Sequence, residues 1–119
     1  MSTPKIPKAA HLTLSLALAD SVSGAAYDGT LDTATATVAL LRDTQSLAGD
    51  LDALVAEGGA ALARWTGDSL SYADGTLSVA VAPADTQALA TIRYRMVVRA
   101  KDNAGNQLPL LSAIVQVAA

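Results

Sequence analysis

Alternation of apolar with small or polar residues runs through most of this chain and predicts extended strands. The pattern is clearest at residues 12–18, where the sequence LTLSLAL places a leucine at every second position. On a strand these leucines share one face, so they are expected to point into a core. Residues 33–41 and 92–99 alternate in the same way, and a chain built from such segments is predicted to be all-β.

Turn signals separate the alternating runs at intervals of roughly eight to twelve residues, which is the spacing typical of a β-sandwich. Asp74 and Gly75 lie between two such runs and predict a tight hairpin. Pro109 predicts an edge position or a bulge near the start of the last strand, residues 107–117. We therefore expect a sandwich of two sheets with about seven antiparallel strands.

One segment departs from the strand pattern and is predicted to be helical. Its apolar residues follow helical spacing before two glycines that signal a stop: Leu47, Leu51, Leu54 and Val55, then Gly58 and Gly59. Residues 46–57 are therefore predicted to form a short helix that crosses between the two sheets. A further helical turn is expected at residues 83–89, where it would bridge two strands.

Length and composition predict one domain with a contact surface of small residues. A chain of 119 residues suits a single core, and we place an N-terminal arm at residues 1–11 and one sandwich domain at residues 12–119. Charged residues make up only 16% of the chain, well below the usual quarter. Small apolar and hydroxyl side chains must therefore face outward, and surfaces of this kind tend to be contact surfaces.

Few side chains offer catalytic or metal-binding chemistry. The absence of cysteine excludes disulfides, thiolate metal sites and cysteine nucleophiles. His11 is the one histidine, and we interpret it as a surface residue on a strand edge. Calcium could be held where Asp28, Asp32 or Asp102 meets loop carbonyls, although the spacing of an EF-hand is absent. We predict no enzymatic activity, no cofactor, no metal and no small-molecule substrate.

A row of basic residues on the strand predicted near residue 95 is the one charge pattern with a functional interpretation. Its members are Arg93, Arg95, Arg99 and Lys101. At a spacing of two they project from one face of a sheet, where they could form a basic stripe for an acidic partner. The alternative is the solvated face of an antiparallel strand, with arginines over opposing Asp or Thr.

Two classes of partner are disfavoured by the overall composition. A net charge of −3 and a sequence pI of about 4.7 argue against a nucleic-acid-binding protein, which would normally be basic. No apolar run approaches the length of roughly eighteen residues that a membrane span needs. The first eight residues, MSTPKIPK, lack the continuous apolar region of a signal peptide.

Several segments in sequence order resemble a known family: LTLSLAL at residues 12–18, ATATVALL at 34–41, YADGTL at 72–77, PADT at 83–86, YRMVVRA at 94–100 and DNAGN at 102–106. Over most of residues 12–117 the chain resembles the immunoglobulin-like domain at the N-terminus of phage baseplate upper proteins and related phage tail and fibre proteins. The match is one of pattern, and bacterial immunoglobulin-like repeats share much of it. The helical insert at residues 46–57 departs from the family's compact pattern.

The resemblance implies a structural function without catalytic residues. Such a domain would dock to a ring or fibre through exposed strand edges and loops. We therefore expect a component of a bacteriophage tail, baseplate, connector or capsid surface, located in the virion after assembly in the host cytoplasm. Its partners would be other virion proteins and further copies of itself in a homo-oligomer. The alternative is a bacterial immunoglobulin-like surface module or a carbohydrate-binding module.

Overall fold

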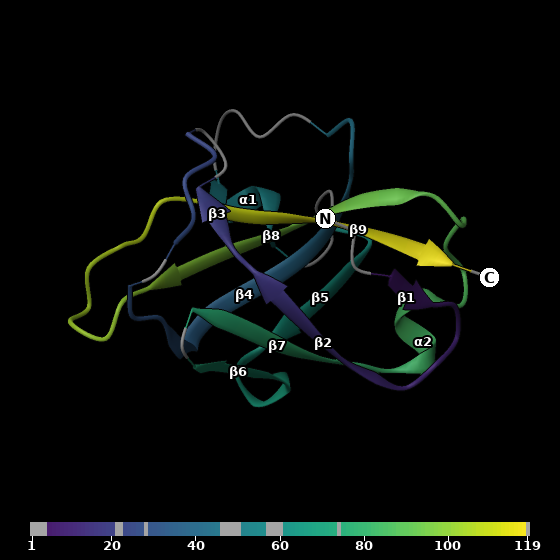
Figure 1. Ribbon diagram of the computed structural model, residues 1–119, viewed down its shortest axis with the longest axis horizontal. Coiled ribbons are helices and arrows are strands. Elements are labelled where there is room, and N and C mark those ends of the chain that lie inside the picture. The colour runs from purple at the N-terminus through teal and green to yellow at the C-terminus, as the bar shows by residue number, and fades with distance from the viewer. Residues whose placement is uncertain are drawn as a thin grey trace.

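Two β-sheets packed face to face form the computed structural model, which describes residues 5–20, 23–27, 29–45, 51–56, 61–73 and 75–118 (Figure 1). The larger sheet has the order β1-β9-β8-β4-β5, and β3 also pairs with β9. Its strands are β1 (Lys5–Pro7), β3 (Ala19–Asp20), β4 (Asp32–Arg42), β5 (Ala63–Thr66), β8 (Arg93–Lys101) and β9 (Leu111–Ala118). The smaller sheet has the order β2-β7-β6, formed by β2 (Leu12–Ala17), β7 (Thr76–Val81) and β6 (Leu70–Ala73).

The strand order is that of an immunoglobulin-like sandwich. When β2, β4, β6, β7, β8 and β9 are taken as strands B to G, the sheets contain B-E-D and G-F-C, as in immunoglobulin domains. Neighbouring strands are antiparallel except for β1, which runs parallel to β9. The prediction of a two-sheet, immunoglobulin-like all-β sandwich is confirmed.

In the described part of the chain, three short helical elements connect the strands: α1 (Leu51–Leu54), the 3₁₀ turn η1 (Gly67–Ser69) and α2 (Pro83–Thr86). Two of them cross between the sheets, because η1 joins β5 to β6 and α2 joins β7 to β8. The prediction of a crossover at residues 46–57 is wrong, because α1 joins β4 to β5, which are antiparallel neighbours in one sheet. Residues 46–50 and 57 lie outside the described part of the chain. No described helix is long and apolar enough to cross a membrane.

The main core lies between the sheets and follows the alternation of the sequence. The smaller sheet and the residue that follows β2 contribute Leu14, Leu16 and Leu18 to this core. The larger sheet contributes residues of β8 to the same cluster: Tyr94, Met96, Val98 and Ala100. Ile92 is 52% exposed, which corrects its predicted inward position, because it precedes the first residue of β8.

A second, smaller apolar cluster lies on the outer side of the larger sheet. It joins residues of α1 and its C-terminal flank to outward-facing residues of the sheet: Leu54 and Val55 with Ala39, Leu41, Val97 and Leu110. β4 is therefore buried on both faces along residues 38–41, and its alternation gives way there to a continuous apolar run.

Three hydrogen bonds fix the connection from β7 to β8 through α2. Tyr94 Oη donates to the carbonyl of Ala90 at 2.9 Å, in the position of the tyrosine corner of immunoglobulin domains. Trp65 Nε1 donates to Asp85 Oδ2 at 3.0 Å, and the Ala82 N–H donates to the same oxygen at 2.8 Å. The start of β8, β5 and α2 are thus held in one arrangement.

The N-terminal segment and the last strand differ in detail from the sequence pattern. Within the arm placed at residues 1–11, Lys5–Pro7 forms β1, and Ile6 is fully buried in the main core. β9 begins after Pro109 and pairs with β8 on one side and with β1 and β3 on the other. The predicted edge position of the last strand is therefore wrong. The hairpin between β6 and β7 is confirmed at Gly75 (φ 77°), while Asp74 lies outside the described residues.

Candidate partner-binding surfaces

The predicted basic row on β8 is divided by a buried residue. Arg95 and Arg99 flank Val97, which is fully buried in the cluster beneath α1. Arg95 Nη2 lies 3.7 Å from Asp43 Oδ1, and Arg99 Nε lies 3.1 Å from Asp52 Oδ1. The two central arginines are thus paired with carboxylates, so the row is not a continuous basic stripe.

The cross-strand register explains the rest of the row. Arg99 lies opposite Thr37 of β4, and Lys101 lies opposite Asp32. This half of the strand therefore fits the alternative interpretation, in which basic side chains on a solvated face lie opposite Asp or Thr. Arg93 lies opposite Gln116 of β9, at the other end. The structure therefore brings Arg99 and Lys101 together and separates them from Arg93.

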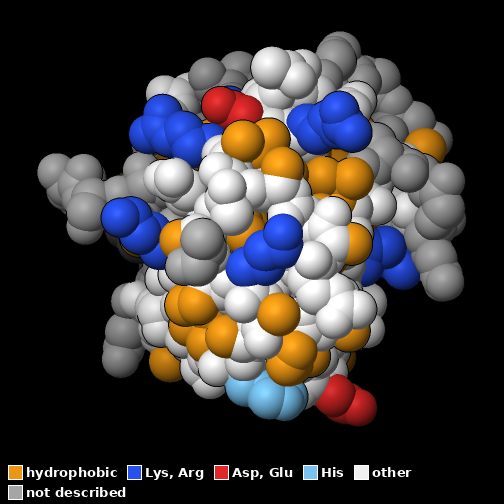
Figure 2. Space-filling view, turned by 90° about the vertical axis from the view of Figure 1, so that its right-hand side faces the viewer, with side chains coloured by type: hydrophobic (Ala, Val, Ile, Leu, Met, Phe, Trp, Pro, Cys, Tyr) orange, Lys and Arg blue, Asp and Glu red, His pale blue; other side chains and the backbone are white. Residues whose placement is uncertain are grey.

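Arg93 instead belongs to a group of basic residues at one end of the larger sheet. This end is formed where β4 ends, β8 begins and β9 runs beside β1. Figure 2 shows the side on which α2, β1 and the end of β9 lie in Figure 1, with Lys and Arg side chains spread among apolar ones. We call it the basic end: Lys5, Lys8, Arg42, Arg93 and Arg95.

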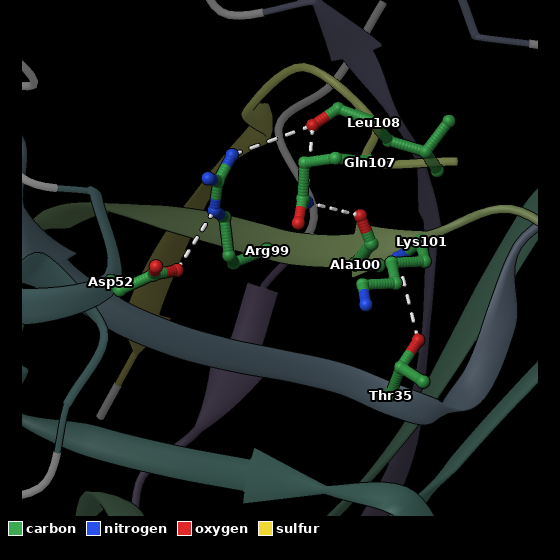
Figure 3. A network of polar contacts seen from close by, with 7 residues as sticks. All are labelled: Thr35, Asp52, Arg99, Ala100, Lys101, Gln107 and Leu108. Carbon is green, nitrogen blue, oxygen red and sulfur yellow. Dashed lines mark hydrogen bonds and ion pairs between the residues drawn. The ribbon is translucent and has the colours of Figure 1, made fainter. Parts of the chain in front are cut away.

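Arg99 and Lys101 line an open groove of about 600 Å³ on the outer side of the larger sheet. The groove lies between α1, β4 and the segment after β8, and is lined mainly by polar side chains: Thr35, Thr37, Asp52, Arg64, Arg99, Lys101 and Gln107. Figure 3 shows how its polar contacts join these elements.

The arginines of the groove are held by backbone and carboxylate oxygens. Arg99 donates through Nε to Asp52 and through Nη1 to the carbonyl of Leu108 at 3.5 Å (Figure 3). Arg64 Nε donates to the carbonyl of Val55 at 2.7 Å. These contacts fix α1 and the segment after β8 against the sheet. Among the described residues, three cations and one carboxylate line the groove, and cations of this kind bind anionic groups.

The described lining of the groove contains one carboxylate, Asp52, which pairs with Arg99, and no histidine. His11, the one imidazole, is exposed at the start of β2 and is not among the residues of the groove. Among the described residues, no three His, Cys, Asp or Glu side chains gather closely enough to hold a metal ion. The predicted loop carboxylates Asp32 and Asp102 instead accept hydrogen bonds from nearby backbone N–H groups, and Asp28 lies outside the described residues.

The outer face of the smaller sheet carries no charged side chain among its described residues. Its outward positions are occupied by hydroxyl residues and alanines: Thr13, Ser15, Ala17, Ser71, Ala73, Thr76, Ser78 and Ala80. Ser15 lies opposite Ser78, which in turn lies opposite Ser71. We call this surface the hydroxyl–alanine face. Period-two alternation predicted its outward side chains on each strand, but the pairing of the three strands into one surface needed the structure.

A shallow pocket of about 530 Å³ lies among the loops at the opposite end from the basic residues. Tyr72 and Asn103 line it together with Thr30. Tyr72 Oη donates to the carbonyl of Gly29 at 2.8 Å, and the Asn103 N–H donates to Thr30 Oγ1 at 3.1 Å. A tyrosine, a hydroxyl and an amide around one depression are groups that can contact a sugar ring.

Comparison with protein-family models, with curated proteins and with solved structures found no match to this chain. Its function is therefore argued from the fold and from these four surfaces: the basic end, the groove, the hydroxyl–alanine face and the loop pocket.

Proposed function

We propose that this chain is a non-enzymatic structural module of a bacteriophage particle, in its tail, baseplate, connector or capsid surface. It would act through protein–protein contacts with other virion proteins and with copies of itself. The observation that supports this proposal is the hydroxyl–alanine face, a whole sheet surface without charge among its described residues. The sequence resemblance to phage tail domains supplies the class of particle.

A sheet face without charge suits an interface, because burying charge is costly. Covering a charged side chain with a partner removes it from water, which costs several kcal/mol unless the charge is paired. Interface centres are accordingly poor in charged residues, although serine and alanine are also less common there than on the rest of the surface. A face without charge avoids this cost, and its short side chains allow another sheet to pack at about 10 Å. A second copy packed through the same face would give a twofold dimer.

A single lysine in the centre of this face tests the proposal. Ser15→Lys places an unpaired ammonium where two sheets would meet, while Thr66→Lys makes a comparable change at an exposed position on β5 of the other sheet. We expect light scattering to give the same oligomeric mass for the parent chain and for Thr66→Lys, and a smaller mass for Ser15→Lys, in which the contact between these faces is lost. Circular dichroism should show the same β-content in all three.

The proposal would be wrong if the parent chain stays monomeric at all accessible concentrations, or if Ser15→Lys assembles like the parent chain. The phage assignment has a separate test. Antibodies raised against the purified domain should label intact phage particles released by a host that carries the gene. Labelling of host cells alone, with none on particles, would reject a virion component.

The loop pocket beside Tyr72 favours the alternative, a bacterial surface or carbohydrate-binding module. In that case a glycan array should identify bound sugars, and Tyr72→Ala should remove the binding. Ile92→Ala, which changes an exposed residue at the opposite end of the sandwich, should keep it. Absence of binding to any glycan by the parent chain would contradict this alternative and leave the assembly proposal unaffected.

A further inference from the structure

The basic end has an excess of positive charge over the carboxylates of the elements that form it. Lys5, Lys8, Arg42 and Arg93 are exposed there, and Arg95 completes the group. The carboxylates at this end are Asp43, which faces Arg95, and Asp85, which accepts hydrogen bonds from Trp65 and Ala82. Five cations against two carboxylates leave a local charge of +3 among the described residues.

The same end exposes an apolar side chain between the charges. Ile92 is 52% exposed and directly precedes Arg93. In register across the sheet, Arg93 lies opposite Gln116, which in turn lies beside Lys5 on β1. An apolar centre with a polar or charged rim is the usual composition of a protein contact, and Figure 2 shows basic and apolar side chains next to one another on the upper part of this face.

The opposite end of the sandwich is acidic. Asp20 closes β3, Asp32 begins β4 and Asp102 follows the last residue of β8. Asp20 lies opposite Leu111, and Asp32 opposite Lys101, so all three are on the far side from the basic end. Asp68 of η1 lies here too, because its neighbour Gly67 approaches Thr33 at the start of β4. Against the one cation Lys101, these four described carboxylates leave a local charge of −3.

We propose that copies of this chain associate head to tail, with the basic end of one copy on the acidic end of the next. This inference rests on the proposed function, in which the chain assembles with itself. The two ends are different surfaces, so the contact is heterologous and each copy uses both ends. Repetition of this contact forms a ring if the rotation closes and a filament if it does not, and opposite charges steer the two ends together.

The test isolates the ends from the hydroxyl–alanine face by using Ser15→Lys as the background. A basic-end variant carries Lys5→Glu and Arg93→Glu. An acidic-end variant carries Asp20→Asn, Asp32→Asn and Asp102→Asn, because asparagine removes the charge while its carbonyl oxygen can still accept the backbone hydrogen bonds of these loops. We expect each variant alone to be monomeric by sedimentation.

Mixing the two variants is the decisive measurement. The basic-end variant keeps an intact acidic end, and the acidic-end variant keeps an intact basic end. These two ends can pair only once, so the mixture should form a one-to-one dimer and no larger species. Lys101→Glu serves as the control, because it reverses a cation at the acidic end and should strengthen association. Since exposed charges are screened by salt, the association constant of the background should fall about tenfold or more between about 50 mM and about 500 mM NaCl.

The outcomes separate this inference from the proposed function. If Ser15→Lys abolishes the assembly seen in the parent chain, and no salt-dependent association remains in this variant, the sheet-face proposal stands and the head-to-tail contact is rejected. Equal association by the basic-end variant and its background also rejects it, as does a mixture in which no dimer forms. If the parent chain never assembles, both proposals fail together.

Discussion

Ala9 adopts a left-handed backbone conformation, with φ of 57°, in the turn between β1 and β2. Its N–H donates to Thr86 Oγ1 at 2.9 Å, and Thr86 is fully buried on α2. This hydrogen bond ties the N-terminal turn to the crossover between the sheets. For a residue with a Cβ atom, this left-handed conformation is less stable than the right-handed one by about 1–2 kcal/mol. The hydrogen bond to Thr86 therefore holds the turn in a conformation that the backbone of Ala9 does not prefer.

Replacing this alanine tests the cost of its conformation. Ala9→Gly removes the Cβ atom and keeps the donor N–H, so the free energy of unfolding should rise by about 0.5 kcal/mol after the greater freedom of the unfolded chain is included. Ala10→Gly lies next to it without a positive φ and should lower stability by about 0.4–1 kcal/mol. Urea denaturation measures both, and a loss of equal size in the two variants would contradict the interpretation.

At the scale of elements, α1 is stable only because it covers the outer side of the larger sheet. Four residues are too few for an isolated helix, and Leu54 and Val55 pack on Leu41 and Val97. The pair between Asp52 and Arg99 adds little, because the Asp52 side chain is 78% exposed and exposed ion pairs contribute about 0–1 kcal/mol.

Two substitutions on α1 separate packing from charge. Leu54→Ala should lower the free energy of unfolding by about 2 kcal/mol or more, because the residue is 8% exposed and leaves a cavity. Asp52→Ala should cost less than about 0.5 kcal/mol. Chemical denaturation of the two variants gives the comparison, and an equal cost for both would show that the ion pair, rather than the apolar cluster, holds α1.

At the scale of the whole molecule, β1 makes the segment before the first long strand part of the sandwich. Ile6 is fully buried between Lys5 and Pro7, which are exposed. Ile6→Ala should therefore destabilise the domain by about 2–5 kcal/mol, whereas Lys5→Ala should change stability by less than about 0.5 kcal/mol. Thermal or urea unfolding checks this. An unchanged stability for Ile6→Ala would show that the N-terminal segment is a separate arm that does not contribute to the core.

The distribution of charge is also a property of the whole molecule. The chain carries a net charge of −3, yet its described ends differ in sign, because antiparallel β4 and β8 bring Arg42 beside Tyr94 and Asp32 beside Lys101. No single segment of the sequence contains the basic end or the acidic end. The polarity follows from which strand ends meet, and the proposed head-to-tail contact depends on it.

The sequence by itself determined the all-β class, the inward faces of β2 and β8 and the hairpin between β6 and β7, because period-two alternation and turn residues act locally. It also located the basic residues of β8 but could not pair them with Asp43 and Asp52. Only the tertiary structure decided that α1 stays on one sheet, that β1 joins β9, and which outward residues form one surface. These features depend on contacts between segments distant in sequence, and no local pattern of hydrophobic and polar residues encodes which strands become neighbours.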